Sequence, residues 1–347
     1  MVDVTTEQPL LFSERPEWSD VVPIEQYDGV SPLAPIFYSE EYKDAANYFR
    51  GIVKTGEMSP RVLDLTERII RLNPAHYSAW QYRYQTLLAT SSSLAAELAL
   101  TNALTKSFLK TYQVWHHRRL LVTLLNEPAP ELPFVENALT VDAKNYHTWS
   151  YRQWVLAHFD RAEMWEGEIA FVERMLDKDV RNNSAWHHRF FVLFERGGAK
   201  TEEAVRRELV FAKEKIALAP NNASAWNYLR GVLDHTHTPY ATQSSFAKLY
   251  TVSPEEEDDD DEDERESEEK GSEHDVLDLE NPAPSKGAKL PCVAALEFMA
   301  DVYEAEGKDG LSRAVELWTS LASEHDTIRK KYWEYRIKEA TTNVQQS

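Results

Sequence analysis

A short motif built on a tryptophan recurs five times in this chain, and it restricts the possible folds more than any other feature. The five copies follow one another at intervals of 34 to 40 residues and centre on Trp80, Trp115, Trp149, Trp186 and Trp226. A period of this length is typical of arrays in which each repeat is a pair of helices stacked on the next pair. No segment shows the sustained alternation of a β-strand. The sequence therefore predicts an all-α protein, a crescent-shaped right-handed superhelix of antiparallel helical hairpins, similar to a tetratricopeptide solenoid.

Other residues stand at helical spacing from these tryptophans. An arginine follows three residues later in four copies (Arg83, Arg118, Arg152 and Arg189), and a tyrosine precedes by three in the first three copies (Tyr77, Tyr112 and Tyr146). Residues three apart share a helix face, so each copy forms a column. We expect the arginine to lie against the indole while its guanidinium binds carbonyl or carboxylate groups of the neighbouring helix. Asparagines at the helix entries suit N-cap or first-turn positions: Asn73, Asn145, Asn182 and Asn222.

A second amphipathic run precedes each tryptophan, which completes the helical pair. These runs are Arg61–Leu72, Leu94–Phe108, Phe134–Val141, Glu168–Leu176 and Ala204–Leu218. Their apolar residues recur at spacings of three and four. An extra amphipathic helix is predicted at Tyr38–Val53, and a degenerate sixth copy at Trp333, with Arg336 three residues later.

The charge of the chain is concentrated in one segment. Of the formal net charge of −20, Glu255–Asp275 accounts for −13, and this segment has too few apolar residues to fold. We therefore expect a single helical-repeat domain at 35–347, interrupted by a disordered acidic insert at 254–287 and preceded by a partly extended N-terminal tail at 1–34. The acidic balance argues against nucleic-acid binding.

The single cysteine and the absence of long apolar runs indicate the compartment. Cys292 is the only cysteine, which excludes an intrachain disulfide and fits a reducing environment. It stands in an apolar run, so a buried structural role is favoured over a nucleophile. No apolar run is long enough to span a bilayer and no secretory leader is visible, so a cytoplasmic protein is expected.

The repeats resemble a known family when they are read residue by residue. They are similar to the α subunit shared by protein farnesyltransferase and protein geranylgeranyltransferase type I, in six stretches: Lys110–Arg119, Asp142–Trp149, Asp179–Trp186, Ser224–Gly231, and parts of Tyr38–Arg50 and Asp326–Trp333. The resemblance covers nearly the whole chain apart from the N-terminal tail and the acidic insert.

This resemblance implies a subunit of a heterodimeric enzyme. The partner would be a β subunit shaped as an α/α barrel, and two different β subunits can use one α subunit. The reaction would transfer an isoprenoid from its diphosphate to the cysteine of a C-terminal CaaX box, in proteins such as small GTPases. The resemblance places a zinc ion in the β subunit, and magnesium accompanying the diphosphate is a further expectation. No cofactor is expected in this chain, since no group has zinc spacing and the adjacent His116 and His117 point about 100° apart on a helix.

Two residues of the second repeat are the main site candidates. Lys110 precedes a predicted helix start, where an ammonium group and free backbone N–H groups can meet a phosphate. The resemblance gives it the role of neutralising charge on the departing diphosphate. Thr111 stands where the family commonly has Asn, and its hydroxyl can keep the helix cap. Gln113 matches the residue that hydrogen-bonds the C-terminal carboxylate of the CaaX peptide. The alternatives are a solvated lysine and a polar surface glutamine.

The remaining candidates lie at the starts of helices in the first three repeats. The resemblance places Asn145, Tyr146 and His147 by the diphosphate, Tyr112 beside the bound substrates and Tyr77 along the path of the peptide. For the tyrosines a structural alternative stays open, because a tyrosine three residues before the tryptophan can simply pack in the repeat column. His147 has no histidine counterpart in the other repeats.

Two rival functions remain. A tetratricopeptide-like scaffold without catalytic role has nearly the same helix spacing, but its consensus lacks Tyr-x-x-Trp-x-x-Arg in this register. The α subunit of Rab-type geranylgeranyltransferase shares the tryptophan repeats, but it can carry extra domains, and its second repeat lacks a close match to the residues around Lys110.

Overall fold

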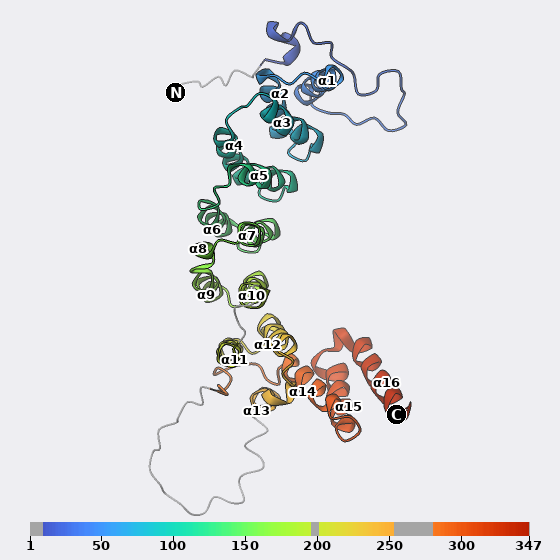
Figure 1. The fold of residues 1–347 in the computed structure, drawn as a ribbon. Helices are drawn as coiled ribbons and strands as arrows, with labels where there is room; N and C mark the ends of the chain where they lie inside the picture. The colour runs from blue at the N-terminus through green and yellow to red at the C-terminus, as the bar shows by residue number, and fades with distance from the viewer. Residues whose placement is uncertain (1–9, 196–200, 253–279, 347) are drawn as a thin grey trace, which may run out of the picture. The chain divides into compact units, whose positions relative to one another are not determined.

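The computed structural model describes residues 10–195, 201–252 and 280–346, and within these ranges it contains helices, turns and loops but no strand (Figure 1). The helices form two compact units, residues 1–160 and 161–347. The all-α prediction is confirmed, and each unit is described by itself below.

The first unit consists of an N-terminal helix and three hairpins. Its helices are α1 (Glu40–Thr55), α2 (Pro60–Leu72), α3 (Tyr77–Ala89), α4 (Leu94–Ser107), α5 (Tyr112–Leu125), α6 (Glu131–Val141) and α7 (Tyr146–Phe159). The hairpins are α2–α3, α4–α5 and α6–α7, and the second helices α3, α5 and α7 contact one another in that order. The helices α3, α5 and α7 thus form one row of the stacked hairpins, called the inner row below. Each repeat tryptophan of this unit lies on one of these helices.

The second unit continues the same pattern with two more hairpins and a C-terminal group. Its helices are α8 (Ala162–Trp165), α9 (Glu168–Lys178), α10 (Asn183–Phe190), α11 (Glu202–Leu218), α12 (Ala223–His235), α13 (Ser244–Lys248), α14 (Val293–Ala305), α15 (Leu311–Ser320) and α16 (Lys330–Gln346). The degenerate sixth copy is confirmed as core, because Trp333 is fully buried and Arg336 forms ion pairs with Asp301 and Glu304.

All five repeat tryptophans are buried and make the same hydrogen bond. Each indole N–H donates to the backbone carbonyl six residues earlier, in the turn that enters its helix: Trp80 to Pro74, Trp115 to Leu109, Trp149 to Ala143, Trp186 to Val180 and Trp226 to Pro220, at 2.7–2.9 Å. A buried indole needs an acceptor for its N–H group. The tryptophan thus fixes both the core and the entry turn of each hairpin.

A buried glutamate joins successive hairpins. Glu97 lies in the first turn of α4. Its carboxylate accepts hydrogen bonds from Nε and Nη2 of Arg83, in the preceding hairpin, at 2.7 and 2.6 Å. It also binds Nε2 of His117 from its own hairpin at 2.8 Å. Such a fork satisfies both carboxylate oxygens, which a buried charge requires.

The same arrangement recurs with different partners further along the chain. Glu131 binds Arg118 and Tyr151, and Glu208 binds Arg189 and Tyr228. The prediction that the arginine reaches carboxylates of the neighbouring helix is confirmed.

The aromatic contact of these arginines differs from the prediction. The guanidinium carbon of Arg118 lies 3.5 Å from the ring centre of Phe134, and that of Arg189 lies 3.7 Å from Phe211. Both phenylalanines follow the bound glutamate by three residues, one helical turn, so the ring stacks on the guanidinium that the glutamate holds. For Arg118 and Arg189 the stacking partner is therefore a phenylalanine and not the indole of their own repeat, which corrects the expectation from the sequence at these two positions.

Three of the four expected asparagine caps are found. The side chains of Asn145, Asn182 and Asn222 accept backbone N–H groups in the first turns of α7, α10 and α12. Asn73 does not, because it ends α2, and the cap of α3 is the ring of His76, which accepts from the N–H group of Ala79. The prediction that Asn73 caps the start of a repeat helix was wrong.

Part of the N-terminal segment belongs to the hydrophobic core of the first unit. Residues 1–9 lie outside the described residues, but Phe12 and Trp18 are buried against Tyr48 of α1, within two short 3-10 helices. The chain then crosses α1 at Gly51, where a Cβ atom would lie 2.5 Å from the carbonyl oxygen of Val22. Only glycine allows this approach. A segment expected as tail thus contributes two large aromatic side chains to the core.

Of the expected acidic insert at 254–287, residues 253–279 lie outside the described part of the chain. Its C-terminal end is described and contacts the second unit: the N–H group of Ser285 donates to the carbonyl of Ala217, and the Tyr250 hydroxyl donates to the carbonyl of Pro282. Cys292 is buried with its thiol 2.9 Å from the carbonyl oxygen of Pro220, and burial raises its pKa. This is the structural role expected for it.

Candidate functional site

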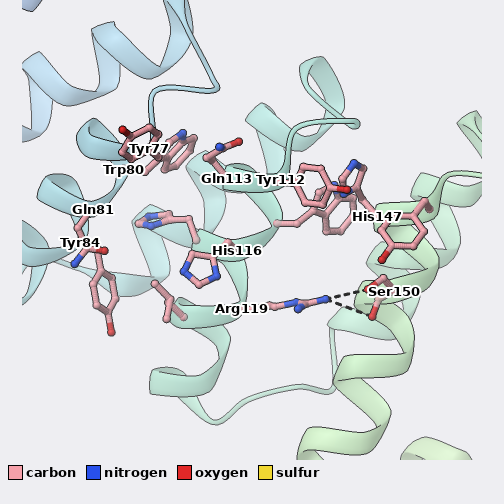
Figure 2. A pocket seen from close by; sticks show the side chains of 14 residues that line it. Tyr77, Trp80, Gln81, Tyr84, Tyr112, Gln113, His116, Arg119, His147 and Ser150 are labelled. Atoms are coloured by element: carbon pink, nitrogen blue, oxygen red, sulfur yellow. Dashed lines mark hydrogen bonds between the residues drawn. The ribbon is translucent and has the colours of Figure 1, made fainter.

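The starts of α3, α5 and α7 border a groove of about 650 Å³ in the first unit (Figure 2). Five of the seven candidate residues line it: Tyr77, Tyr112, Gln113, Tyr146 and His147. The other lining residues are Trp80, Gln81, Tyr84, Trp115, His116, His117, Arg119, Leu120 and Ser150. Residues from three repeats thus meet at one concave site, because the inner helices stack in register.

The three repeat tyrosines point into solvent. Tyr77 is 75% exposed, Tyr112 is 67% exposed and Tyr146 is 68% exposed. The alternative in which they pack within the repeat column is therefore wrong, for Tyr77 as well as for the other two. Large aromatic side chains left in solvent next to a groove are available for a ligand or partner.

His147 connects the second and third repeats. Its ring centre lies 4.2 Å from that of Tyr112, edge to face, and 5.6 Å from that of Tyr146. The backbone of Lys110 lies near enough to the imidazole to influence its pKa. Burial lowers the pKa of His147, a shift that the nearby backbone of Lys110 partly opposes. His147 is thus one link between the starts of α5 and α7.

Lys110 lies beside the groove rather than in its lining. Its side chain is 79% exposed, and Nζ lies 3.3 Å from Oδ2 of Asp142. Burial alone would raise the pKa of Asp142, but hydrogen bonds from the Lys144 amide and the Lys110 ammonium lower it. Thr111 is the N-cap of α5, yet its side chain makes no cap hydrogen bond, contrary to the expectation for its hydroxyl. The N–H groups of the first turn of α5 therefore receive no cap from that side chain.

Asn145 occupies a different kind of position from the other candidates. It is buried, and its Oδ1 accepts the backbone N–H group of Thr148 at 3.1 Å and the hydroxyl of Thr148 at 3.2 Å. Its amide thus fixes the first turn of α7, which carries Tyr146 and His147. Asn145 therefore caps α7 and does not line the groove.

The groove also contains residues that sequence reasoning missed. Arg119 reaches from α5 to Ser150 of α7, and His116 stands exposed in the lining. His117 instead is buried on Glu97, so the two adjacent histidines separate as helix geometry requires. The available signal for Arg119 was a second arginine directly after the repeat arginine.

The described part of the chain offers no metal site of its own, since no group of three His, Cys, Asp or Glu side chains there could hold an ion. Among the helices of the described residues, none combines the length and apolar character needed to cross a membrane.

Comparison with known proteins accounts for the repeats. The model of the protein prenyltransferase alpha subunit repeat matches five times, at 59–90, 94–125, 129–159, 165–196 and 205–236. The Dictyostelium discoideum protein farnesyltransferase/geranylgeranyltransferase type-1 subunit alpha is 35% identical over 94% of this chain and 92% of its own length. This chain belongs to the protein prenyltransferase α-subunit family.

Two further relatives agree with this assignment. The Schizosaccharomyces pombe protein farnesyltransferase/geranylgeranyltransferase type-1 subunit alpha is 44% identical over 63% of this chain and 73% of its own length. Among solved structures, a chain of Candida albicans protein geranylgeranyltransferase-I complexed with GGPP is 28% identical, with a TM-score of 0.77 and coverage of 93% of this chain and 98% of that chain. The family thus extends over both units of the described fold.

Proposed function

We propose that this chain is the α subunit of a heterodimeric CaaX prenyltransferase, working in the cytoplasm with a β subunit of the farnesyltransferase or geranylgeranyltransferase type I kind. The reaction is attack of a cysteine thiolate on C1 of the isoprenoid, with formation of the S–C bond, cleavage of the C1–O bond and departure of the diphosphate. This chain supplies charge and orientation. A zinc ion held by the β subunit would supply activation of the thiol, and magnesium would accompany the diphosphate.

The observation that carries the proposal is the position of Lys110. It is an exposed ammonium just before the start of α5, and its backbone lies near the ring of His147 from the next repeat. A helix start attracts anions through its free N–H groups and its dipole, and a lysine adds a full charge. Asp142 holds Nζ at 3.3 Å in the free chain, and the diphosphate replaces this contact on binding.

The roles of the other residues follow from their places in the groove. Tyr146 and His147 face the diphosphate from the start of α7, which Asn145 fixes from below. Tyr112 stands between the two substrates because its ring packs against His147. Lys110 then neutralises the charge that grows on the diphosphate oxygen as the C1–O bond lengthens.

The CaaX peptide occupies the other part of the groove. Gln113, one residue after Tyr112 on α5, donates its amide N–H to the C-terminal carboxylate of the peptide. Tyr77, exposed at the start of α3, borders the path along which the peptide enters. An amide binds the carboxylate without adding a second full charge beside the diphosphate site.

Co-expression tests this function directly. The full chain is produced with a β subunit of either kind, and transfer of labelled farnesyl or geranylgeranyl from its diphosphate to a CaaX peptide is measured. A matched peptide with serine in place of cysteine is the control, and the chain without β subunit is expected to be inactive. Assembly with neither kind of β subunit, or a stable heterodimer without transfer, contradicts the proposal.

The relatives that match over most of their length favour this function over a non-catalytic scaffold and over the Rab-type α subunit. The relatives that cover most of both chains carry the name of the shared type-1 subunit. A scaffold without catalytic role does not need an exposed lysine, three exposed tyrosines and a histidine gathered at one groove.

A further inference from the structure

One cation in the groove has no strong partner in the described structure. Arg119, on α5, makes two long hydrogen bonds from Nη2 to Ser150, at 3.5 Å to the backbone carbonyl and 3.3 Å to the hydroxyl. Its Nε is buried without any hydrogen-bond partner. Its guanidinium carbon lies 5.3 Å from the ring centre of Trp154. Two inner-row arginines of this unit, Arg83 and Arg118, instead each hold a glutamate by a full fork.

The groove around Arg119 is prepared for a negative group. None of the described residues that line it is acidic. Burial lowers the pKa of Arg119, the effect expected when a guanidinium loses water and gains no carboxylate. A buried donor without an acceptor is costly, so a complementary acceptor is expected in the functional state of the protein.

The diphosphate is too far away to be this acceptor. Arg119 lies seven residues after the first residue of α5, which is about 10 Å along the helix axis from the helix start. The C-terminal carboxylate of the peptide is held at Gln113 in the proposed function. In Figure 2 the side chain of Arg119 extends toward Ser150, while Gln113 lies on the far side of His116. A third anion is therefore required.

We propose that Arg119 anchors the heterodimer by binding a carboxylate side chain of the β subunit. This inference rests on the proposed function. Arginine is enriched at the centres of protein–protein interfaces, and Arg119 lies in a groove whose described lining contains no acidic residue. Arg119 can receive a carboxylate by the same bidentate fork that Arg83 and Arg118 use within the chain.

The test is the rate of subunit exchange in the assembled heterodimer. A complex with labelled chain is mixed with excess unlabelled chain, and loss of label from the β subunit is followed for wild type, Arg119→Lys, Arg119→Met and Arg119→Glu. Because loss of one partner of a buried pair acts on dissociation, we expect exchange to accelerate about thirtyfold or more in Arg119→Met. Exchange should be faster still in Arg119→Glu, because the new carboxylate faces the carboxylate of the β subunit. The exchange rate of Arg119→Lys should lie between those of wild type and Arg119→Met.

Two comparisons separate this role from a structural one. Arg119→Met and Arg119→Glu both remove the contacts to Trp154 and Ser150, so a purely structural role predicts the same effect for both. If the free chains of the two variants melt at the same temperature and their heterodimers exchange at the same rate, the proposal is overturned. Arg71→Met is the matched control, because Arg71 is a surface arginine of α2 paired with Glu67, and it is expected to exchange like wild type.

The outcome is also distinguishable from a failure of the proposed function. Wild-type chain that does not assemble or transfer prenyl groups contradicts that function itself. An assembled, active wild type in which the Arg119 variants raise the KM for the CaaX peptide without changing exchange assigns Arg119 to the substrate and overturns the anchor. Unchanged exchange and unchanged KM overturn it as well.

Discussion

The ring of His147 stands edge to face against the ring of Tyr112, 4.2 Å between centres, across the boundary of two repeats. The backbone of Lys110 lies near the same imidazole and influences its pKa. One side chain of α7 therefore contacts the start of α5, the helix that carries Tyr112 and Gln113 and that follows Lys110. The candidate site is a property of two adjacent repeats, which explains why one copy of the motif could not form it.

Diphosphate binding should depend on the protonation of His147. Burial lowers the pKa of this residue below the ordinary value of 6.5, so its ring is neutral in the free protein at neutral pH. A bound anion favours the charged ring, which raises the pKa in the complex. The affinity of the heterodimer for the isoprenoid diphosphate is therefore expected to rise as the pH falls from 8 toward 6, measured by calorimetric titration.

Protonation of the diphosphate itself also depends on pH, and a His147→Gln variant controls for it. The amide cannot titrate, so the part of the pH dependence that belongs to the ring is lost in the variant. Identical pH profiles for wild type and His147→Gln would exclude His147 as a diphosphate group.

Gln113→Ala should impair the peptide and spare the isoprenoid. Loss of one hydrogen bond to a charged carboxylate is worth about 1.5–3 kcal/mol, so the KM for the CaaX peptide should rise roughly tenfold or more. A peptide with a C-terminal amide lacks the charge that Gln113 binds, and with it the variant and wild type should differ little. Equal losses for the acid and the amide peptide would mean that Gln113 does not contact the peptide end.

The hairpins could be predicted from the sequence because each is specified locally. The tryptophan period and the apolar spacing of three and four correspond directly to the inner and outer helices, for example Leu94–Ser107 and Tyr112–Leu125. The connection between hairpins could not be predicted. Glu97 must be paired with Arg83 and His117, at separations of 14 and 20 residues, and no local rule specifies such distances.

The site was foreseen only in part for the same reason. Lys110 and Gln113 were found through the residues next to them in the sequence. Exposure of Tyr77 depends on which face of α3 the next hairpin covers, and the helical column alone favoured burial. Arg118 and Arg119 are adjacent in the sequence, but Arg118 meets a glutamate fork and Arg119 only a weakly bound serine.

Truncation of Trp149 tests the core assignment of the repeats. Its side chain is buried and its indole N–H donates to the carbonyl of Ala143 at 2.9 Å. Trp149→Ala should lower the free energy of unfolding by about 3–5 kcal/mol, and Trp149→Phe by less, because the ring volume is largely kept. Tyr146 lies on the same helix and is exposed, so Tyr146→Ala should unfold in urea like wild type. A wild-type midpoint for Trp149→Ala would contradict the core assignment.

Acid should weaken the connection at Glu97. Although burial acts to raise its pKa, hydrogen bonds from His117 and Arg83 lower it from 4.5 to about 2. The unfolded chain thus binds more protons between these values, so the stabilisation is complete above pH 4.5 and is lost as the pH falls toward 2. The amount involved is on the order of 3 kcal/mol.

Urea unfolding of wild type and Glu97→Gln at pH 6 and pH 3 measures this. The difference in the free energy of unfolding between the two proteins should be smaller at pH 3, because the glutamine does not titrate. A difference that stays constant with pH would show that Glu97 gains no stability from its charge.

Lys110→Ala in the assembled heterodimer tests the central claim most directly. If Lys110 acts mainly on the charge that develops on the leaving diphosphate, its loss slows the chemical step more than it weakens isoprenoid binding. Single-turnover transfer at saturating isoprenoid diphosphate is predicted to slow by roughly ten- to a thousandfold, on the scale of oxyanion-donor deletions. Lys110→Arg should restore part of the rate, and the subunit exchange rate should stay that of wild type. An unchanged single-turnover rate in Lys110→Ala would contradict the account.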